Sequence, residues 1–171
     1  MSNDARTGGD GAAVRAFTRL VARLDYPMFV VTAAAGGERS GCLVGFASQC
    51  SISPPRVVVW ISEKNHTHGV ARGAQALAVH VLGDDDAGLA VLFGGETGDE
   101  VDKFTRCAWH EGALGAPVLD GAAGWFVGRV LDHLDTGDHL GFLLEPVDAF
   151  VRDQPTIGYQ DVKDLDPGHD P

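Results

Sequence analysis

The chain has 171 residues, of which 44% are hydrophobic and 22% charged, so it is large enough for one globular domain with a core. Its formal net charge of -11 argues against nucleic-acid binding, which requires clustered Lys and Arg, and no apolar run approaches the roughly 20 residues of a membrane span. The polar N-terminus shows no secretory signal, so we expect a cytoplasmic protein with neither nucleic acid nor membrane as a partner.

The first part of the chain predicts a tail and a helix. Residues 1–11 are rich in Gly, Asp and Asn and are expected to be disordered. Over residues 12–24 the apolar side chains recur at intervals of three and four, which is the period of an amphipathic helix. Tyr26-Pro27 ends this helix.

Strands dominate the rest of the sequence. Short helices are expected at 69–73 and 87–93, and turn signals recur about every ten residues, as in closed antiparallel barrels. We therefore predict one mainly β domain over residues 12–152 and a polar C-terminal tail over 153–171. Runs of β-branched and apolar residues predict strands at 29–33, 40–51, 56–61, 76–82, 122–134 and 139–147.

The acidic residues and the cysteines indicate no separate site. The acidic runs at 84–86 and 96–102 are typical of solvated loops. Cys42, Cys50 and Cys107 are odd in number and lack the spacing of a zinc site or a disulfide framework. We expect three buried, reduced thiols and no bound metal.

The extended segment 41–51 is the first candidate binding site. It combines glycines, small residues and uncharged polar side chains immediately before an apolar strand. Small residues let a flat ligand approach the backbone, whose N–H and C=O groups can contact the polar edge of the ligand. Taken alone, the pattern favours an ordinary strand with a bulge at Gly45 over a binding site.

A polar turn, Glu63-Lys64-Asn65-His66-Thr67, is the second candidate. It places a cation at the expected start of a helix, an arrangement that suits a phosphate. Asn65 or Thr67 could equally be the N-cap of that helix, and both interpretations can hold together.

The turn Gly137-Asp138-His139 is the third candidate. His139 could be a general acid, a ligand contact or a solvent-exposed turn residue, and the last is favoured by the local pattern alone. His66 and His68 could form a metal pair, but no further ligands are suitably spaced, so a metal site is discounted.

Taken in order, these segments resemble the flavin reductase-like family of FMN-binding split barrels, whose members often supply reduced flavin to a monooxygenase. The resemblance covers about residues 16–150 and rests on eight short motifs in the right order, none of them decisive by itself. In this sequence the motifs occupy residues 26–32, 41–55, 57–61, 64–67, 92–95, 103–104, 115–119 and 137–139.

The resemblance implies a fold and a reaction. The fold is an FMN-binding split β-barrel, a closed antiparallel Greek-key barrel with a few short helices. The reaction is hydride transfer from NADH or NADPH to FMN or FAD. Family members form homodimers in which both chains contribute to the flavin cleft, and a monooxygenase component can receive the reduced flavin.

The resemblance also implies contacts for individual residues. Lys64, Asn65 and His66 would bind the flavin phosphate, and Phe93 would line the adjoining wall. His139, as the catalytic residue, would face the nicotinamide. The flavin ring and ribityl chain would contact mainly backbone groups of Leu43, Val44, Gly45, Phe46, Ala47, Gln49 and Cys50.

The sequence departs from the family at two places. Common members have Thr-Ala-Asn-Ser-Phe where this chain has residues 43–47, so the Asn and Ser side chains that could touch the flavin are missing. Ser48 and Gln49 are the candidates to take over. Lys103 replaces an Arg, which keeps the charge and loses the bidentate fork.

Two other functions are compatible with the same residues. The first is a flavin- or haem-binding module of this fold without nicotinamide turnover. The second is an oxidoreductase that retains its flavin tightly and acts on its own organic substrate.

Overall fold

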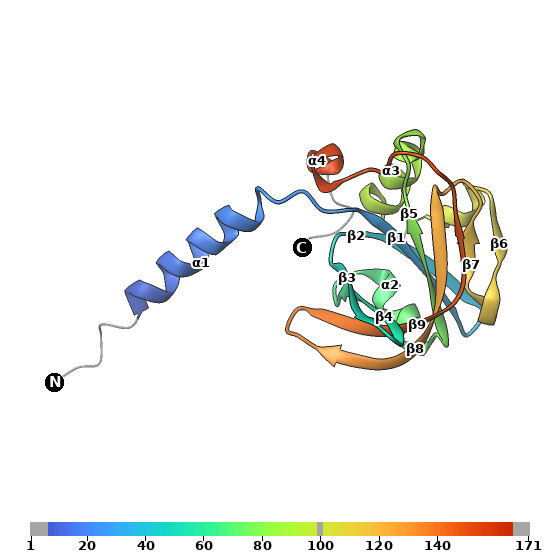
Figure 1. Ribbon diagram of the computed structural model, residues 1–171, viewed down its shortest axis with the longest axis horizontal. Helices are drawn as coiled ribbons and strands as arrows, with labels where there is room; N and C mark the ends of the chain where they lie inside the picture. The colour runs from blue at the N-terminus through green and yellow to red at the C-terminus, as the bar shows by residue number, and fades with distance from the viewer. Residues whose placement is uncertain (1–6, 99–100, 166–171) are drawn as a thin grey trace.

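The computed structural model describes residues 7–98 and 101–165, with a seven-stranded antiparallel sheet as the body (Figure 1). In sheet order the strands are β2 (Glu38–Val44), β1 (Phe29–Ala35), β5 (Ala76–Val81), β8 (Gly124–Asp135), β9 (His139–Val151), β4 (Pro55–Ser62) and β3 (Ala47–Ile52). A separate two-stranded ribbon pairs β6 (Trp109–Glu111) with β7 (Pro117–Leu119). The helical elements are α1 (Thr7–Val21), α2 (His66–Gly73), α3 (Ala87–Gly95) and α4 (Tyr159–Val162), with 3-10 turns η1 (Asp84–Asp86), η2 (Lys103–Thr105) and η3 (Ala113–Gly115).

The predicted mainly β class is confirmed, and the helix boundaries differ from the expectation. α1 begins at Thr7, so residues 7–11, which were assigned to a disordered tail, are helical. Residues 1–6 of that predicted tail lie outside the described part of the chain. No helix within the described residues is long and apolar enough to cross a membrane.

Apolar side chains bury both faces of the central strands. β1 and β5 lie in the middle of one half of the sheet, and their near-continuous apolar sequences match burial on two sides. Val31 and Leu77 point into a cluster that α2 completes, whereas Val30 points into a second cluster under α3. The core therefore has two layers, one on each face of the curved sheet.

The prediction of a closed barrel is wrong, because the sheet keeps two edges, β2 and β3. These edges are consecutive along the chain, separated by Gly45-Phe46. The sequence predicted one extended segment over 40–51, and the structure divides it into the last strand at each end of the sheet. Because β2 and β3 do not pair with each other, the sheet stays open between them, although the chain links them directly.

The segment after residue 153 packs against the body, although its composition suggested only a polar tail. Ile157 is buried in the cluster that contains Val30, and its amide donates a hydrogen bond to the Leu82 carbonyl. Isolated bridges join Pro27 to Gly158 and Gly83 to Thr156. The rings of Tyr26 and Tyr159 then stack with centroids 4.9 Å apart.

Candidate functional site

A cleft of about 700 Å³ lies beside the first residue of β9. Its walls are mainly aromatic and aliphatic, and they come from α1, the β2–β3 link, β4 and the β8–β9 turn. Four aromatic rings and one imidazole surround it, which suits a flat ligand. The lining residues are Thr18, Val21, Ala22, Leu24, Tyr26, Gly45, Phe46, Ala47, Trp60, Thr136, Asp138, His139 and Tyr159.

Strand pairing brings His139 against Phe46. His139 lies opposite Ser62 at the end of β4, and two residues earlier the Trp60 amide donates to the Phe46 carbonyl at 2.8 Å. The ring centroids of Phe46 and His139 are consequently 5.1 Å apart. Two of the predicted segments, far apart in the sequence, therefore meet at one place.

Asp138 orients the imidazole of His139. Nδ1 of His139 lies 2.7 Å from Oδ1 of Asp138. The hydrogen bond from His139, helped by its charge and that of Lys64, lowers the pKa of Asp138, so this carboxyl is ionised at neutral pH. Because the carboxylate can only accept, Nδ1 carries a proton, and in the neutral ring Nε2 is the acceptor.

Gly45 makes the bend between the two edge strands possible. A Cβ at this position would lie 2.7 Å from the Tyr26 ring and 3.2 Å from the Met28 sulfur. The glycine therefore lets the backbone approach the aromatic wall of the cleft. The bulge that was expected here lies instead between Gln49 and Ser51, where β3 shifts its register against β4.

The Lys64 turn is attached to the same end of the cleft. The Glu63 amide donates to the Asp138 carbonyl at 3.0 Å, so the turn and the β8–β9 loop are held together. Asn65 is the N-cap of α2, and its side chain accepts a hydrogen bond from the Thr67 amide at 2.9 Å. The capping interpretation is confirmed. The phosphate interpretation stays a prediction, because Lys64 and the residues of α2 are not among those that line the cleft.

His66 turns away from this cleft. Its Nε2 lies 2.7 Å from Oε1 of Glu38, and it lines a second hollow of about 360 Å³ beside Lys103. The Lys103 side chain is buried and donates to the carbonyls of Gly41 and Phe93, each at 3.2 Å. Burial lowers the pKa of Lys103, partly offset by Cys42 and Glu96.

The remaining predicted contacts do not line the cleft by their side chains. Val44 is buried in the first core cluster, Leu43 is half-buried against the second, and Phe93 is buried inside the second. Ser48 and Gln49 lie exposed on β3 and bond to neighbouring carbonyls of their own strand.

The backbone of β3 is nevertheless placed to serve a ligand. Among the described strands β3 pairs with β4 alone, so the amides and carbonyls of its outer edge face away from the sheet. The contact of a flavin with residues 47–50 would therefore run through backbone groups. Together with the aromatic cleft and the Lys64 turn, this edge fits a flavin.

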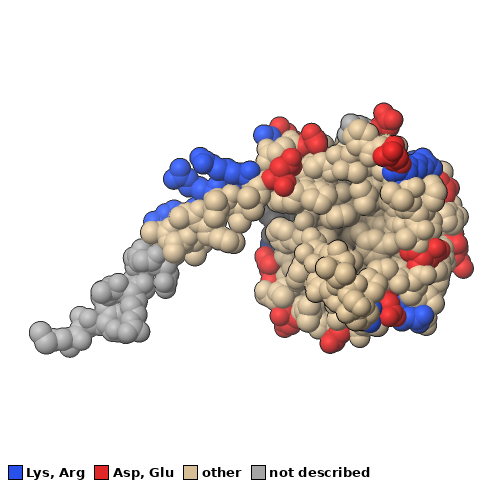
Figure 2. All heavy atoms as spheres, in the orientation of Figure 1, with Lys and Arg blue, Asp and Glu red and all other residues tan. Residues whose placement is uncertain are grey.

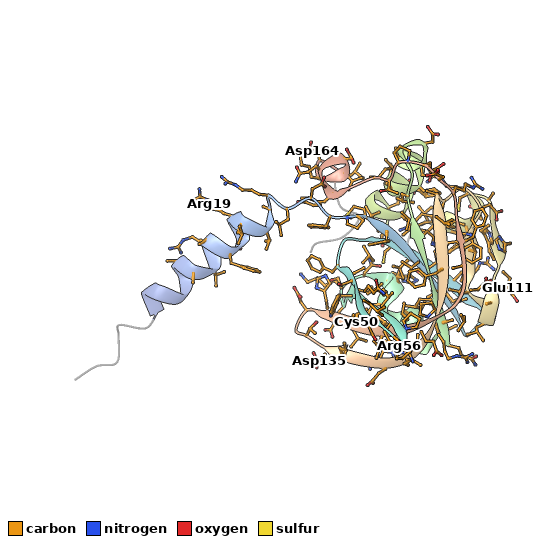
Figure 3. The ribbon with its side chains drawn as sticks, in the orientation of Figure 1. Arg19, Cys50, Arg56, Glu111, Asp135 and Asp164 are labelled. Carbon is orange, nitrogen blue, oxygen red and sulfur yellow. The ribbon has the colours of Figure 1, made fainter. Side chains whose placement is uncertain are left out.

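The cysteines differ from one another. Cys42 is buried, and desolvation raises the pKa of its thiol to about 11. Cys107 is half-buried, whereas Cys50 is exposed on β3, so its expected burial is wrong (Figure 3). β3 is an edge strand in which residues 48–50 are all exposed, so neither face of the strand is covered at this position. No group of His, Cys, Asp and Glu side chains within residues 7–98 and 101–165 is arranged to hold a metal.

Sequence reasoning missed three aromatic walls of the cleft. Tyr26, Trp60 and Tyr159 come from a loop, from β4 and from the C-terminal segment. Trp60 carried the one local signal, because it interrupts a run of valines in a strand that is otherwise buried. No pattern in the sequence around Tyr159 indicates that it contacts Tyr26.

Comparisons with known proteins agree with this geometry. A family model described as "Flavin reductase like domain" matches residues 21–163. The reductase component of a 4-nitrophenol 4-monooxygenase/4-nitrocatechol 2-monooxygenase from Rhodococcus opacus is 32% identical over 133 residues, 78% of this chain and 70% of the relative. An FMN reductase (NADH) from Ancylobacter novellus is 29% identical over 119 residues, 70% of this chain and 65% of that protein.

A solved structure shows the same fold. The NADH:FAD oxidoreductase SgcE6 of Streptomyces globisporus C-1027 superposes with a TM-score of 0.76 at 25% sequence identity. The superposition covers 83% of this chain and 85% of the other. The fold, the order of the motifs and the extent of the family match lead to one conclusion: the chain belongs to the flavin reductase-like domain family.

Proposed function

We propose that this flavin reductase passes a hydride from NADH or NADPH to FMN or FAD in the cleft beside His139. The observation that carries the proposal is the meeting of Phe46, Trp60 and His139 around a cleft of about 700 Å³. A mainly apolar site with a few polar groups at its end is what stacked flavin and nicotinamide rings require.

Different elements of the protein would contact different parts of the flavin. The outer backbone edge of β3 would contact the polar edge of the ring, and Lys64 with the first amides of α2 would bind the phosphate. Phe46 and Trp60 would pack against the rings and exclude water. The side chains of Ser48, Gln49 and Phe93 would contribute little, because they lie on the exposed face of β3 or inside the core.

The flavin, when bound, supplies the acceptor for the hydride. The protein contributes orientation, because two rings held in register reach the geometry of transfer far more often than two free molecules. We assign this orienting role to His139, which Asp138 fixes through Nδ1 so that Nε2 can meet the nicotinamide.

We further propose that the protein is a cytoplasmic homodimer that supplies reduced flavin to a monooxygenase. The support for the monooxygenase is that a relative, the Rhodococcus opacus protein, is named a reductase component. The support for the homodimer is the exposed edge of β3 beside the cleft, which one chain leaves open.

The test is to mix the purified protein with NADH or NADPH and with FMN or FAD, and to follow the loss of the nicotinamide absorbance. We expect flavin-dependent oxidation of the nicotinamide. A protein that binds flavin tightly and oxidises neither nicotinamide would be a binding module instead. A protein that stays yellow through dialysis and needs an added organic substrate for turnover would be an oxidoreductase with its own substrate.

A further inference from the structure

The second hollow, beside Lys103, has no part in the proposed reaction and shares no lining residue with the cleft. Its volume of about 360 Å³ lies within the range of about 300–1,000 Å³ of small-molecule sites. The start of β2, the start of α2 and the segment from the end of α3 into η2 form its walls. Its lining residues are 37–41, His66, Gly98 and 101–104.

Lys103 places an unused hydrogen-bond donor in this hollow. Its side chain is buried, and Nζ donates to the carbonyls of Gly41 and Phe93, each at 3.2 Å. As an ammonium it carries three N–H groups, and the third has no hydrogen-bond partner within residues 7–98 and 101–165. A buried charged donor without an acceptor costs free energy, so this N–H favours a ligand that accepts hydrogen bonds.

Arg39 is the second cation of the hollow. It is exposed on β2, and its guanidinium carbon lies 4.6 Å from the ring centroid of Trp109 and 5.8 Å from that of Phe104. In the described part of the chain it forms no ion pair with a carboxylate. A guanidinium that stacks on an aromatic ring with one face can stack on a planar base with the other, and its N–H groups match a phosphate.

The acidic groups of the hollow are already engaged within the protein. Oε1 of Glu38 lies 2.7 Å from Nε2 of His66, and Oδ1 of Asp102 accepts a hydrogen bond from the Phe104 amide at 3.0 Å. Acidic side chains are spread over the face of the body that Figure 2 shows, and the chain has 24 acidic against 13 basic residues. Two cations that face one hollow therefore differ from the general surface of this protein, and they favour an anionic ligand there.

The hollow and the cleft are connected along two segments. Gly41 lines the hollow and Gly45 lines the cleft, so the two sites are about 13 Å apart at about 3.3 Å per extended residue. His66, which lines the hollow, directly follows the Lys64 turn, and this turn is hydrogen-bonded to the β8–β9 loop at the cleft. A ligand with its ring in the cleft and one phosphate at the Lys64 turn would place its next group in the hollow.

We propose that the second hollow binds an adenosine phosphate, the group that FAD and the nicotinamide nucleotides carry and that FMN and riboflavin lack. Lys103 and Arg39 bind the phosphate, and the adenine stacks on the free face of the Arg39 guanidinium. The inference rests on the proposed function for the position of the flavin ring. The connection through the Lys64 turn favours FAD as the source of the adenosine phosphate, and the nicotinamide nucleotide is the other source of the same group.

The first experiment compares Arg39→Gln with Arg129→Gln in the full chain. Both variants remove one exposed arginine charge, and Arg129 lines neither the hollow nor the cleft. The probe is adenosine 5′-monophosphate, titrated by calorimetry. It should bind the wild type and Arg129→Gln alike and Arg39→Gln about 10-fold or more weakly, because the phosphate loses a charge-assisted hydrogen bond. No binding to the wild type, or equal binding to the two variants, would overturn the inference.

A second pair of variants tests the buried donor. Lys103→Met should weaken binding of the same probe, whereas Lys103→Arg, which keeps a cation, should largely retain it. Because Lys103 also holds two carbonyls, thermal denaturation accompanies these titrations. If Lys103→Met does not fold, the Arg39→Gln titration decides the question.

Flavin and nicotinamide titrations identify the source of the adenosine phosphate. If it belongs to FAD, Arg39→Gln should raise the dissociation constant of FAD about 10-fold and leave that of FMN unchanged. If it belongs to the nicotinamide nucleotide, Arg39→Gln should raise the KM for NADH with FMN as acceptor and leave FAD binding unchanged. Equal weakening of FMN and FAD would contradict both sources.

The probe titration requires no turnover, so it separates this inference from the proposed function. Flavin reduction without binding of adenosine 5′-monophosphate would overturn the adenosine site alone. Specific binding of the probe in a protein that oxidises neither nicotinamide would overturn the proposed reaction and keep the site.

Discussion

The imidazole of His139 stands between an aromatic ring, Phe46, and a carboxylate, Asp138. The first contact is apolar and belongs to the cleft, and the second fixes the ring from the solvent side. This position suits a residue that orients a nicotinamide without holding the flavin itself.

We therefore expect His139→Ala to separate turnover from binding. The variant should lower kcat for nicotinamide oxidation by about 10²-fold, because the nicotinamide loses its orientation. The dissociation constant of FMN, measured by fluorescence titration, should stay near that of the wild type. A large loss of FMN affinity would assign His139 to flavin binding instead.

Gly45 offers a second test at the level of one residue. Gly45→Ala places a Cβ 2.7 Å from the Tyr26 ring, so the aromatic wall must shift, and we expect a loss of about 1–3 kcal/mol in the free energy of unfolding. Gly69→Ala is the control, because nothing lies within 4 Å of its Cβ and alanine favours the helix interior. Chemical denaturation of both variants measures the difference. Equal stability of the two variants would show that the bend tolerates a side chain.

Among the elements, α2 combines a structural cap with the proposed phosphate contact. Asn65 caps the helix through the Thr67 amide. Aspartate caps equally well but adds a negative charge beside Lys64, so the two roles of this turn can be separated.

We expect Asn65→Asp to keep the stability of the protein and to weaken FMN binding, while riboflavin, which has no phosphate, binds as before. Asn65→Ala should instead cost about 1 kcal/mol of stability. Thermal denaturation measures the first effect, and parallel FMN and riboflavin titrations measure the second. Equal weakening for both ligands would place the phosphate elsewhere.

The C-terminal segment is also an element of the fold, because Ile157 is buried under α3 and Tyr159 completes the cleft. Ile157→Ala should destabilise the protein by about 2–5 kcal/mol, whereas the exposed neighbour Thr156→Ala should change stability little. Urea unfolding of the two variants gives the comparison. If Ile157→Ala is as stable as the wild type, the segment is not part of the cooperative unit.

For the molecule as a whole, buried His80 couples the stability to pH. Its Nδ1 lies 2.9 Å from the Val30 carbonyl, and its Nε2 accepts from the Leu119 amide at 3.0 Å, so it joins β5 to β1 and β7. Burial, opposed by the hydrogen bond to Val30, lowers the pKa of His80 to about 4. The neutral ring is therefore the folded form.

Stability should fall as the pH drops through the interval between the two pKa values of His80. Its contribution is fully present above the unfolded pKa, about 6.5, and is lost progressively down to about 4, because the unfolded chain takes up the proton first. Over this interval the free energy of unfolding should fall by about 3 kcal/mol. Urea unfolding at several pH values and an NMR titration of His80 measure it. A ring that titrates near pH 6.5 in the folded protein would contradict the assignment.

The sequence predicted β1, β4, β5, β8 and β9 because they carry runs of β-branched and other apolar residues, whereas it joined β2 and β3 into one segment and missed β6 and β7. It also singled out His139 and the Lys64 turn, since both lie at strand ends and carry polar side chains, and their roles stay predictions. The sequence did not predict three features: the gap between the edge strands β2 and β3, the burial of Ile157, and the stacking of Tyr26 on Tyr159. Each of these depends on segments that meet only after folding, and no local period encodes such a meeting.

The link Gly45-Phe46 between the two edge strands limits where insertions and deletions can occur in a protein of this fold. Successive side chains of a strand face opposite sides, so deleting one residue at 45–46 would turn every side chain of β3 to the other face or break its pairing with β4. The edge of β3 that is proposed to contact the flavin and the ring of Phe46 that contacts His139 would be displaced together. Length variation among relatives should therefore spare this link and collect in loops such as the one between α3 and η2.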